Sequence, residues 1–234
     1  MGAEGTLLER LDLVVFDLVG TTVIIGNQIP EAFAGAFQEH GIILSEWEIL
    51  EIRGRSKREA ISILLEKHVS PPSTSMGDSV FESFQMLLQR MLRNGVAEAI
   101  PGSEDTFLWL RERGIRIALN TGLETILTMQ LLEQMGWVST VDAVVCGDQV
   151  PTGRPAPDLI IESMRRLDCR NPSRVVALGD TRADLEAARS AGVGLVVGVL
   201  SGAHDSEQLK ALPSDVIIPS VADLPGLLSL KNRP

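Results

Sequence analysis

After Pro101, short apolar runs alternate regularly with helical patterns. This alternation constrains the fold more than any other feature of the sequence. Each run is five or six residues long, and most are rich in Val and Ala. The expected strands cover residues 115–119, 141–146, 174–178 and 194–199, and the expected helices cover about 104–113, 124–135, 157–167 and 183–191. A last helix, strand and helix follow. This alternation predicts βαβ units, and therefore an α/β fold with a parallel sheet.

The N-terminal part of the chain follows a different pattern. Residues 11–16 form another short, β-branched run, which we expect to be a buried strand of the same sheet. Between Pro30 and about Asn94, apolar side chains recur at helical spacing, and we find no strand signal. We therefore expect a helical block that is inserted into the α/β core after its first strand.

The composition of the chain limits the classes of binding partner that we expect. Acidic residues outnumber basic ones 31 to 21, which gives a formal net charge of -10 and no overall basic footprint for nucleic acid. Apolar stretches fall short of the roughly 20 residues that span a bilayer, so we expect no membrane partner. The two cysteines, Cys146 and Cys169, form no CxxC pair, which favours a reduced, cytoplasmic protein.

Polar residues follow the expected strands. Asp17 comes after the first strand, Thr121 and Gly122 come after the second, and the pair Asp180 and Asp184 comes after 174–178. Because ligands of open parallel sheets bind at the carboxyl ends of the strands, these side chains are candidates for one site. Carboxylates in such a place suit a nucleophile or a Mg²⁺ ion, and a hydroxyl beside backbone N–H groups suits a phosphoryl oxygen.

Arg154 is a further candidate, because Gly153 and Pro155 fix the loop on either side of it. Its guanidinium could bind two phosphoryl oxygens or a carboxylate. Each candidate also has a plain structural interpretation: the aspartates and Thr121 could cap turns and helices, and Arg154 could be a solvated loop residue. Their order along the chain, each at a strand end, favours the functional interpretation.

In these motifs the chain resembles the haloacid dehalogenase superfamily of hydrolases, and within it the phosphonatase (phosphonoacetaldehyde hydrolase)-like branch. The first motif of that branch reads Asp-x-Ala-Gly-Thr, and here it is Asp17-Leu18-Val19-Gly20-Thr21. Gly153-Arg154-Pro155 replaces the more usual Gly-Lys-Pro, and Gly179-Asp180-Thr181 is followed by Asp184. The stretch from Val197 to His204 also resembles that group. The resemblance covers nearly the whole chain.

The resemblance implies a Rossmann-like catalytic core, residues 1–22 and 98–234, with an all-helical cap of the C1 type at 23–97. It implies that Asp17 is a nucleophile that forms an aspartyl-phosphate. Mg²⁺ would be held by Asp17, the Val19 carbonyl, Asp180 and Asp184. The phosphoryl group of a small phosphate or phosphonate substrate would be held by Thr121, Gly122 and Arg154.

Val19 is the most informative residue of the first motif. Phosphatases and mutases of the superfamily have an aspartate there, which protonates the departing alkoxide, and valine cannot do so. Phosphonatases avoid this need, because a cap lysine forms a Schiff base with the substrate aldehyde. Lys57 lies where that branch has its lysine, three residues after Gly54, and within a basic cluster of Arg53, Arg55, Lys57 and Arg58. We expect neighbouring positive charge to lower the pKa of Lys57, and we expect Arg53 and Lys57 to bind the anionic substrate.

The sequence departs from the phosphonatase pattern at three positions. Ala60 replaces a histidine, Arg53 replaces a methionine, and Leu123 replaces a tyrosine. The alternatives are therefore a phosphatase acting on a small metabolite and a non-catalytic binding protein that keeps the fold. Apolar faces of the cap helices could also serve a homodimer.

Overall fold

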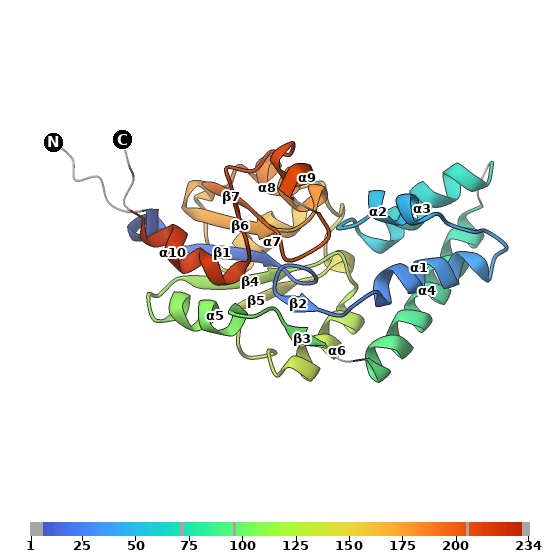
Figure 1. Cartoon of the computed structure of the whole chain (residues 1–234), viewed down its shortest axis with the longest axis horizontal. Coiled ribbons are helices and arrows are strands. Elements are labelled where there is room, and N and C mark those ends of the chain that lie inside the picture. Colours follow the sequence, from blue (N-terminus) through green and yellow to red (C-terminus); the bar gives the residue numbers. More distant parts are fainter. Residues whose placement is uncertain (1–6, 71–72, 96, 205, 231–234) are drawn as a thin grey trace.

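The core of the protein is a six-stranded sheet. The computed structural model describes residues 7–70, 73–95, 97–204 and 206–230. The strands are β1 (Leu13–Asp17), β4 (Arg116–Asn120), β5 (Ala143–Val145), β6 (Val175–Gly179), β7 (Leu195–Val199) and β8 (Val216–Ile218). They lie in the order β5-β4-β1-β6-β7-β8, and every neighbouring pair is parallel. The first strand is therefore central (Figure 1), as its continuous apolar pattern predicts.

Helices cover both faces of this sheet. Alternate side chains of β1 point to opposite sides, so that Leu13 and Val15 join one apolar cluster while Val14 and Phe16 join another. The first cluster is completed by α7 (Asp158–Arg166), α8 (Arg182–Ala191) and α9 (Ser206–Lys210), and the second by α5 (Ser103–Arg111), α6 (Thr125–Met135) and α10 (Leu224–Ser229). The 3-10 turns are η1 (Leu7–Arg10), η2 (Gly147–Gln149), η3 (Pro172–Arg174) and η4 (Val221–Asp223).

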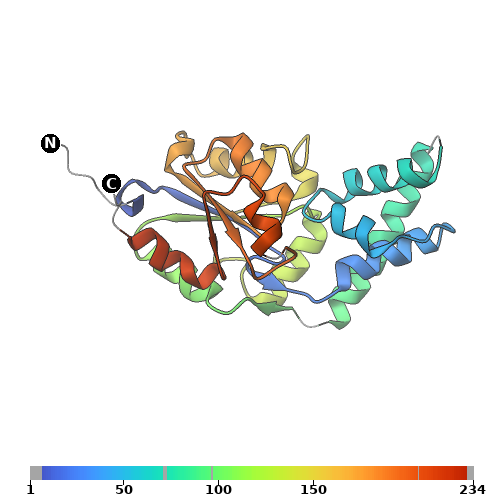
Figure 2. The same ribbon diagram turned by 45° about the horizontal axis from the view of Figure 1, so that its top comes forward.

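A block of four helices stands at one end of the sheet, on the right in Figures 1 and 2. It consists of α1 (Gln28–Gln38), α2 (Glu46–Glu51), α3 (Lys57–His68) and α4 (Thr74–Asn94). A two-stranded antiparallel ribbon of β2 (Val23–Ile24) and β3 (Glu98–Ala99) joins it to the core. Helix α4 also packs against α6 of the core, where Gln134 Nε2 donates a 2.9 Å hydrogen bond to the Leu92 carbonyl oxygen.

The α/β architecture with a parallel sheet and an inserted helical block is confirmed. Its expected strands differ from the observed ones by one or two residues at their ends. The β2–β3 ribbon was not expected, because two residues are too short to show a period. We propose that this ribbon is the boundary between the catalytic core and the cap. Among the described residues, no helix is long and apolar enough to cross a membrane.

Candidate active site

Strand ends of the core and the start of cap helix α3 meet around one cavity of about 260 Å³. Asp17 ends β1, Thr121 and Gly122 follow β4, and Asp180 follows β6. Arg154 comes from the loop before α7, and Lys57 is the first residue of α3. Val19 and Arg53 also line the cavity, whereas Asp184 lies behind Arg154 and in contact with it. The structure thus brings together all the residues that we predicted for the site.

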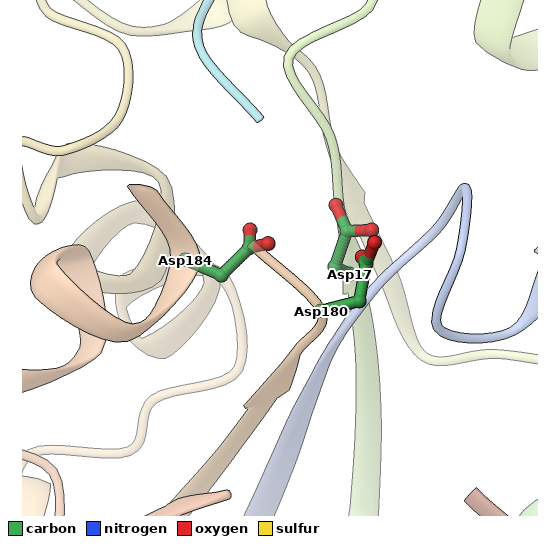
Figure 3. A group of neighbouring side chains, drawn as sticks. All are labelled: Asp17, Asp180 and Asp184. Atoms are coloured by element: carbon green, nitrogen blue, oxygen red, sulfur yellow. The ribbon is translucent and has the colours of Figure 1, made fainter. Parts of the chain in front are cut away.

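Three carboxyl groups cluster at one end of the cavity, which Asp17 and Asp180 line. Asp17, Asp180 and Asp184 are all buried, and one oxygen of each lies within 4.8 Å of the others. Figure 3 shows the three side chains turned toward a common space. The turn before α8 explains the position of Asp184, because Thr181 caps the helix and its backbone N–H donates to Asp184 Oδ2 at 3.0 Å.

Asp180 is held by neighbours on two sides. The Thr21 hydroxyl donates to Asp180 Oδ1 at 3.2 Å, and the backbone N–H of Ala203 donates to Oδ2 at 2.7 Å. Ala203 belongs to the loop after β7, and the Ser201 hydroxyl ties that loop to the Gly20 carbonyl oxygen at 2.8 Å. The loops after β1 and β7 therefore fix one carboxylate between them.

The electrostatics of this cluster favour an added cation. Burial and then the charge of Asp184 raise the pKa of Asp17 well above its ordinary value. The same two causes raise the pKa of Asp180 to about 7. Three buried carboxyl groups in one place repel each other, and oxygen ligands of this kind suit a hard divalent ion. The donor set and the excess negative charge therefore fit a metal site.

Arg154 is the counter-charge that the described residues supply. Its Nη1 pairs with Asp17 Oδ1 at 2.6 Å and contacts Asp184 Oδ1, and its Nη2 donates to the Asn120 carbonyl oxygen at 3.0 Å. Burial opposes the charge of this guanidinium, but Asp184 and Asp17 outweigh it and raise the pKa of Arg154. Arg154 is thus 2% exposed and in contact with Asp17, and the interpretation of it as a solvated loop residue is wrong.

Two glycines, Gly54 and Gly122, allow the cap loop before Lys57 to lie close to the core. A Cβ atom on Gly54 would lie 2.1 Å from Thr181 Oγ1, and one on Gly122 would lie 2.5 Å from the Arg55 carbonyl oxygen. Gly54 also has a φ of +80°, which favours glycine. The loop before Lys57 therefore approaches the core more closely than any side chain would permit, and this approach places the lysine over the strand ends.

Lys57 is a buried amine. It is 5% exposed, and its Nζ donates a 3.1 Å hydrogen bond to the Arg55 carbonyl oxygen. Burial lowers the pKa of Lys57 to about 8, with Arg154 acting in the same direction and Glu124, Asp17 and Asp184 opposing it. At neutral pH a larger fraction of this amine is uncharged than for an exposed lysine, which suits a nucleophilic role.

The expected role of the basic cluster is partly wrong. Arg55 pairs with Glu59 at 2.7 Å, and Arg58 pairs with Asp78 at 2.8 Å. Both cations are thus engaged with acids of the cap, and neither lines the cavity with Lys57 and Arg53. Burial leads the shift in the pKa of Lys57, and the cation that adds to it is Arg154 of the core.

Sequence reasoning missed several contributors to the site. Asn120 contacts Arg154 through its side-chain and carbonyl oxygens, and Ala203 acts through its backbone, which no side-chain motif reports. Glu124 is buried, and burial raises its pKa, while the Oε2 atom has no hydrogen-bond partner among the described residues. Glu124 lies two residues after Gly122 in the sequence, so its closeness to the second motif could have identified it as a candidate.

Comparisons with known proteins agree with these motifs. The family model of haloacid dehalogenase-like hydrolases matches residues 11–192. A phosphonoacetaldehyde hydrolase of Bordetella avium is 26% identical over 262 aligned positions, which cover 97% of this chain and 93% of that protein. A phosphorylated carbohydrates phosphatase of Thermotoga maritima is 25% identical, covering 85% of this chain and 90% of that protein.

A solved structure shares the fold. The crystal structure of a hydrolase from Pseudomonas syringae has a TM-score of 0.84 and 22% identity, and the match covers 93% of this chain and 97% of that one. The resemblance that the motifs indicated, to the superfamily and to its phosphonatase-like branch, is confirmed. This chain therefore belongs to the haloacid dehalogenase-like hydrolases.

Proposed function

We propose that this hydrolase cleaves the P–C bond of a small phosphonate that carries a neighbouring carbonyl group, with phosphonoacetaldehyde as the reference substrate. One observation carries the proposal: the buried amine of Lys57 lines the same cavity as Asp17, where the first motif has Val19 in place of an acid. A lysine that forms an imine makes a carbon leaving group possible without a general acid at position 19. The name of the Bordetella avium relative supports this reaction.

On the phosphoryl side, Asp17 is the nucleophile. One of its carboxylate oxygens attacks phosphorus, so that an O–P bond forms as the P–C bond breaks. Arg154, Thr121 and Gly122 line the space beside Asp17 and are placed to hold the other phosphoryl oxygens. Their contribution is positioning and neutralisation of charge. Water then hydrolyses the aspartyl-phosphate, which releases phosphate and restores Asp17.

Magnesium fits the polar end of the cavity. We propose that Asp17, Asp180, Asp184 and the Val19 carbonyl hold Mg²⁺, which would supply positive charge beside the phosphoryl group. Thr21 and Ala203 keep Asp180 in place for this role.

On the leaving side, Lys57 carries the carbon fragment. Its uncharged amine adds to the carbonyl and expels water, and the imine that forms takes up a proton from solvent, giving a protonated imine. When the P–C bond breaks, its electron pair forms a C=C bond while the π pair of the C=N bond moves onto nitrogen, which leaves an enamine on Lys57. The enamine takes a proton, and a second water hydrolyses the imine, which frees the aldehyde and the amine. Arg55 positions the amine through its carbonyl oxygen.

The three departures change the surroundings of Lys57 but keep its access to the cavity. Ala60 is buried and has no group that could move a proton. Leu123 and Arg53 line the cavity, so one wall loses a hydroxyl while another gains a cation. The charge of Glu124 acts on Lys57 and favours its protonated form.

The test is phosphate release from phosphonoacetaldehyde in the presence of Mg²⁺, measured beside a panel of phosphate esters that includes sugar phosphates. We expect faster release from the phosphonate, loss of release when a chelator is added, and recovery when Mg²⁺ is restored. Faster release from an ester would contradict the proposal. It would favour the alternative, a phosphatase, which the name of the Thermotoga maritima relative supports.

A further inference from the structure

One part of the cavity wall consists mostly of apolar side chains. Its side chains include Ile25, Ile29, Phe33, Ile49, Ile52 and Leu123. Phe33 is fully buried, and Ile25 and Ile52 are each 2% exposed, whereas Ile24, which also lines the cavity, is 44% exposed, so this wall is largely buried and partly open to solvent. Among the described residues from 23 to 57, the polar side chains that line the cavity are Asn27, Arg53 and Lys57.

This wall selects against hydroxyl groups. A sugar or polyol brings several hydroxyls, and each one that is buried without a partner costs about 1–3 kcal/mol. Among described residues 23–57 that line the cavity, the side chains that could bond to them are Asn27, Arg53 and Lys57, and the aliphatic and aromatic side chains offer no partner. A hydrocarbon chain in the same place is favoured, because each buried methylene contributes about 0.8 kcal/mol.

The size of the cavity limits the length of such a chain. A cavity of about 150 Å³ is enough for a ligand of the size of benzene. The volume here is about 260 Å³, which also has to hold the phosphoryl group. The remaining space fits a few carbon atoms, and Lys57 lies beside it to receive a carbonyl.

We propose that the substrate is a phosphono-aldehyde or phosphono-ketone that bears a short alkyl substituent, which lies against Phe33, Ile49 and Ile52. This inference rests on the proposed function and adds the nature of the carbon fragment. The apolar wall makes the protein prefer that fragment over a hydroxylated one.

The test measures binding and needs no turnover. Methyl-, ethyl-, propyl- and pentylphosphonate, and 2,3-dihydroxypropylphosphonate, are titrated into the wild-type protein with Mg²⁺ in a calorimeter. From methyl to propyl we expect the affinity to rise about fourfold for each methylene. Pentylphosphonate should fall below this trend when the cavity is full. The dihydroxypropyl compound should bind at least about tenfold more weakly than propylphosphonate.

Three variants locate the effect on the cavity wall. Ile52→Asn should remove most of the preference for propyl- over dihydroxypropylphosphonate. Ile43→Asn, at an 85% exposed position, should leave the preference unchanged. Phe33→Leu enlarges the cavity and should let pentylphosphonate follow the trend, which keeps the location testable if Ile52→Asn does not fold.

The outcomes separate the two proposals. If methylphosphonate binds but affinity does not change with chain length, the apolar-wall inference is wrong and the proposed function stands. Tighter binding of a carboxylated phosphonate such as phosphonoacetate than of propylphosphonate would also overturn the inference and would point to Arg53. If neither methylphosphonate nor inorganic phosphate binds, the phosphoryl site at Asp17 and Arg154 is wrong, and the inference fails with it.

Discussion

The two walls of the cavity are built in different ways. On the core wall, charged side chains hold one another: Arg154 contacts Asp17 and Asp184, and Thr21 and Ala203 hold Asp180. On the cap wall, apolar side chains predominate, and the polar ones from the described residues 23–57 are Asn27, Arg53 and Lys57. Under the proposed function, the core wall would hold the phosphoryl group and the cap wall would select the fragment that leaves. Substitutions in the two walls should therefore fail in different ways.

The largest effect should follow a change in the core wall. Asp17→Asn removes the proposed nucleophile and should lower phosphate release from every substrate by at least about 10⁴-fold. Asp168→Asn is the control, because Asp168 is an exposed loop residue with a φ of +45°, which asparagine also adopts. Phosphate release is measured under Mg²⁺ with thermal unfolding as the check on folding. Retention of activity by Asp17→Asn would refute catalysis at this strand end.

A change of the cap amine should be selective. Lys57→Arg keeps a cation but cannot form an imine, so release from phosphonoacetaldehyde should fall by about 10³-fold. Methylphosphonate binding should change only a few-fold, because the core wall is intact. Lys67→Arg, an exposed position on the same helix that pairs with Glu51, should behave as wild type. Equal loss of binding and turnover in Lys57→Arg would make Lys57 a binding residue only.

The pH dependence distinguishes a buried amine from an exposed one. The pKa of Lys57 is lowered from 10.5 to about 8, mainly by burial, so the amine is protonated below that pH and uncharged above it. The rate of Lys57 acetylation, followed by peptide mass spectrometry, should rise with pH with a midpoint near 8. At pH 6 it should be about 100-fold below its plateau. Glu124→Gln should lower the midpoint further, since Glu124 favours the charged amine. A midpoint near 10.5 would contradict the burial of Lys57.

The smallest expected loss of activity comes from a substitution in the cap loop that contacts the core. Gly54→Ala places a methyl group 2.1 Å from Thr181 Oγ1, so the loop has to move away from the core. We expect kcat/KM to fall by about tenfold through misplacement of Lys57. Gly41→Ala shares the left-handed backbone, with a φ of +76°, but meets nothing within 4 Å. The two variants should lose similar stability in thermal unfolding. If their kcat/KM values are also alike, the close approach of the loop does not position Lys57.

Much of the fold could be predicted because its strands are continuous apolar runs. The runs at 174–178 and 194–199 became β6 and β7 with little change, since buried parallel strands need apolar side chains on both faces. The β2–β3 ribbon could not be predicted, because four residues in two strands carry no period. It is defined by the path of the chain between core and cap.

Which residues lie at the candidate site could be predicted from the sequence. Which of them contact one another could be predicted less well. Asp17, Asp180 and Thr121 were found because carboxyl ends of neighbouring strands must meet. The contact between Arg154 and Asp184 depends on the course of a loop, and Ala203 contributes a backbone N–H, so neither leaves a side-chain signal. The cause of the shift in the pKa of Lys57 was misjudged for a similar reason: salt bridges occupy Arg55 and Arg58, and burial is visible only in three dimensions.

Trapping of the imine tests the central claim most directly. The protein is incubated with Mg²⁺ and phosphonoacetaldehyde, borohydride is added, and peptides are analysed by mass spectrometry. We predict a reduced adduct on Lys57, formed only when substrate is present, together with loss of phosphate release. Continued phosphate release under borohydride, with Lys57 unmodified, would contradict the account.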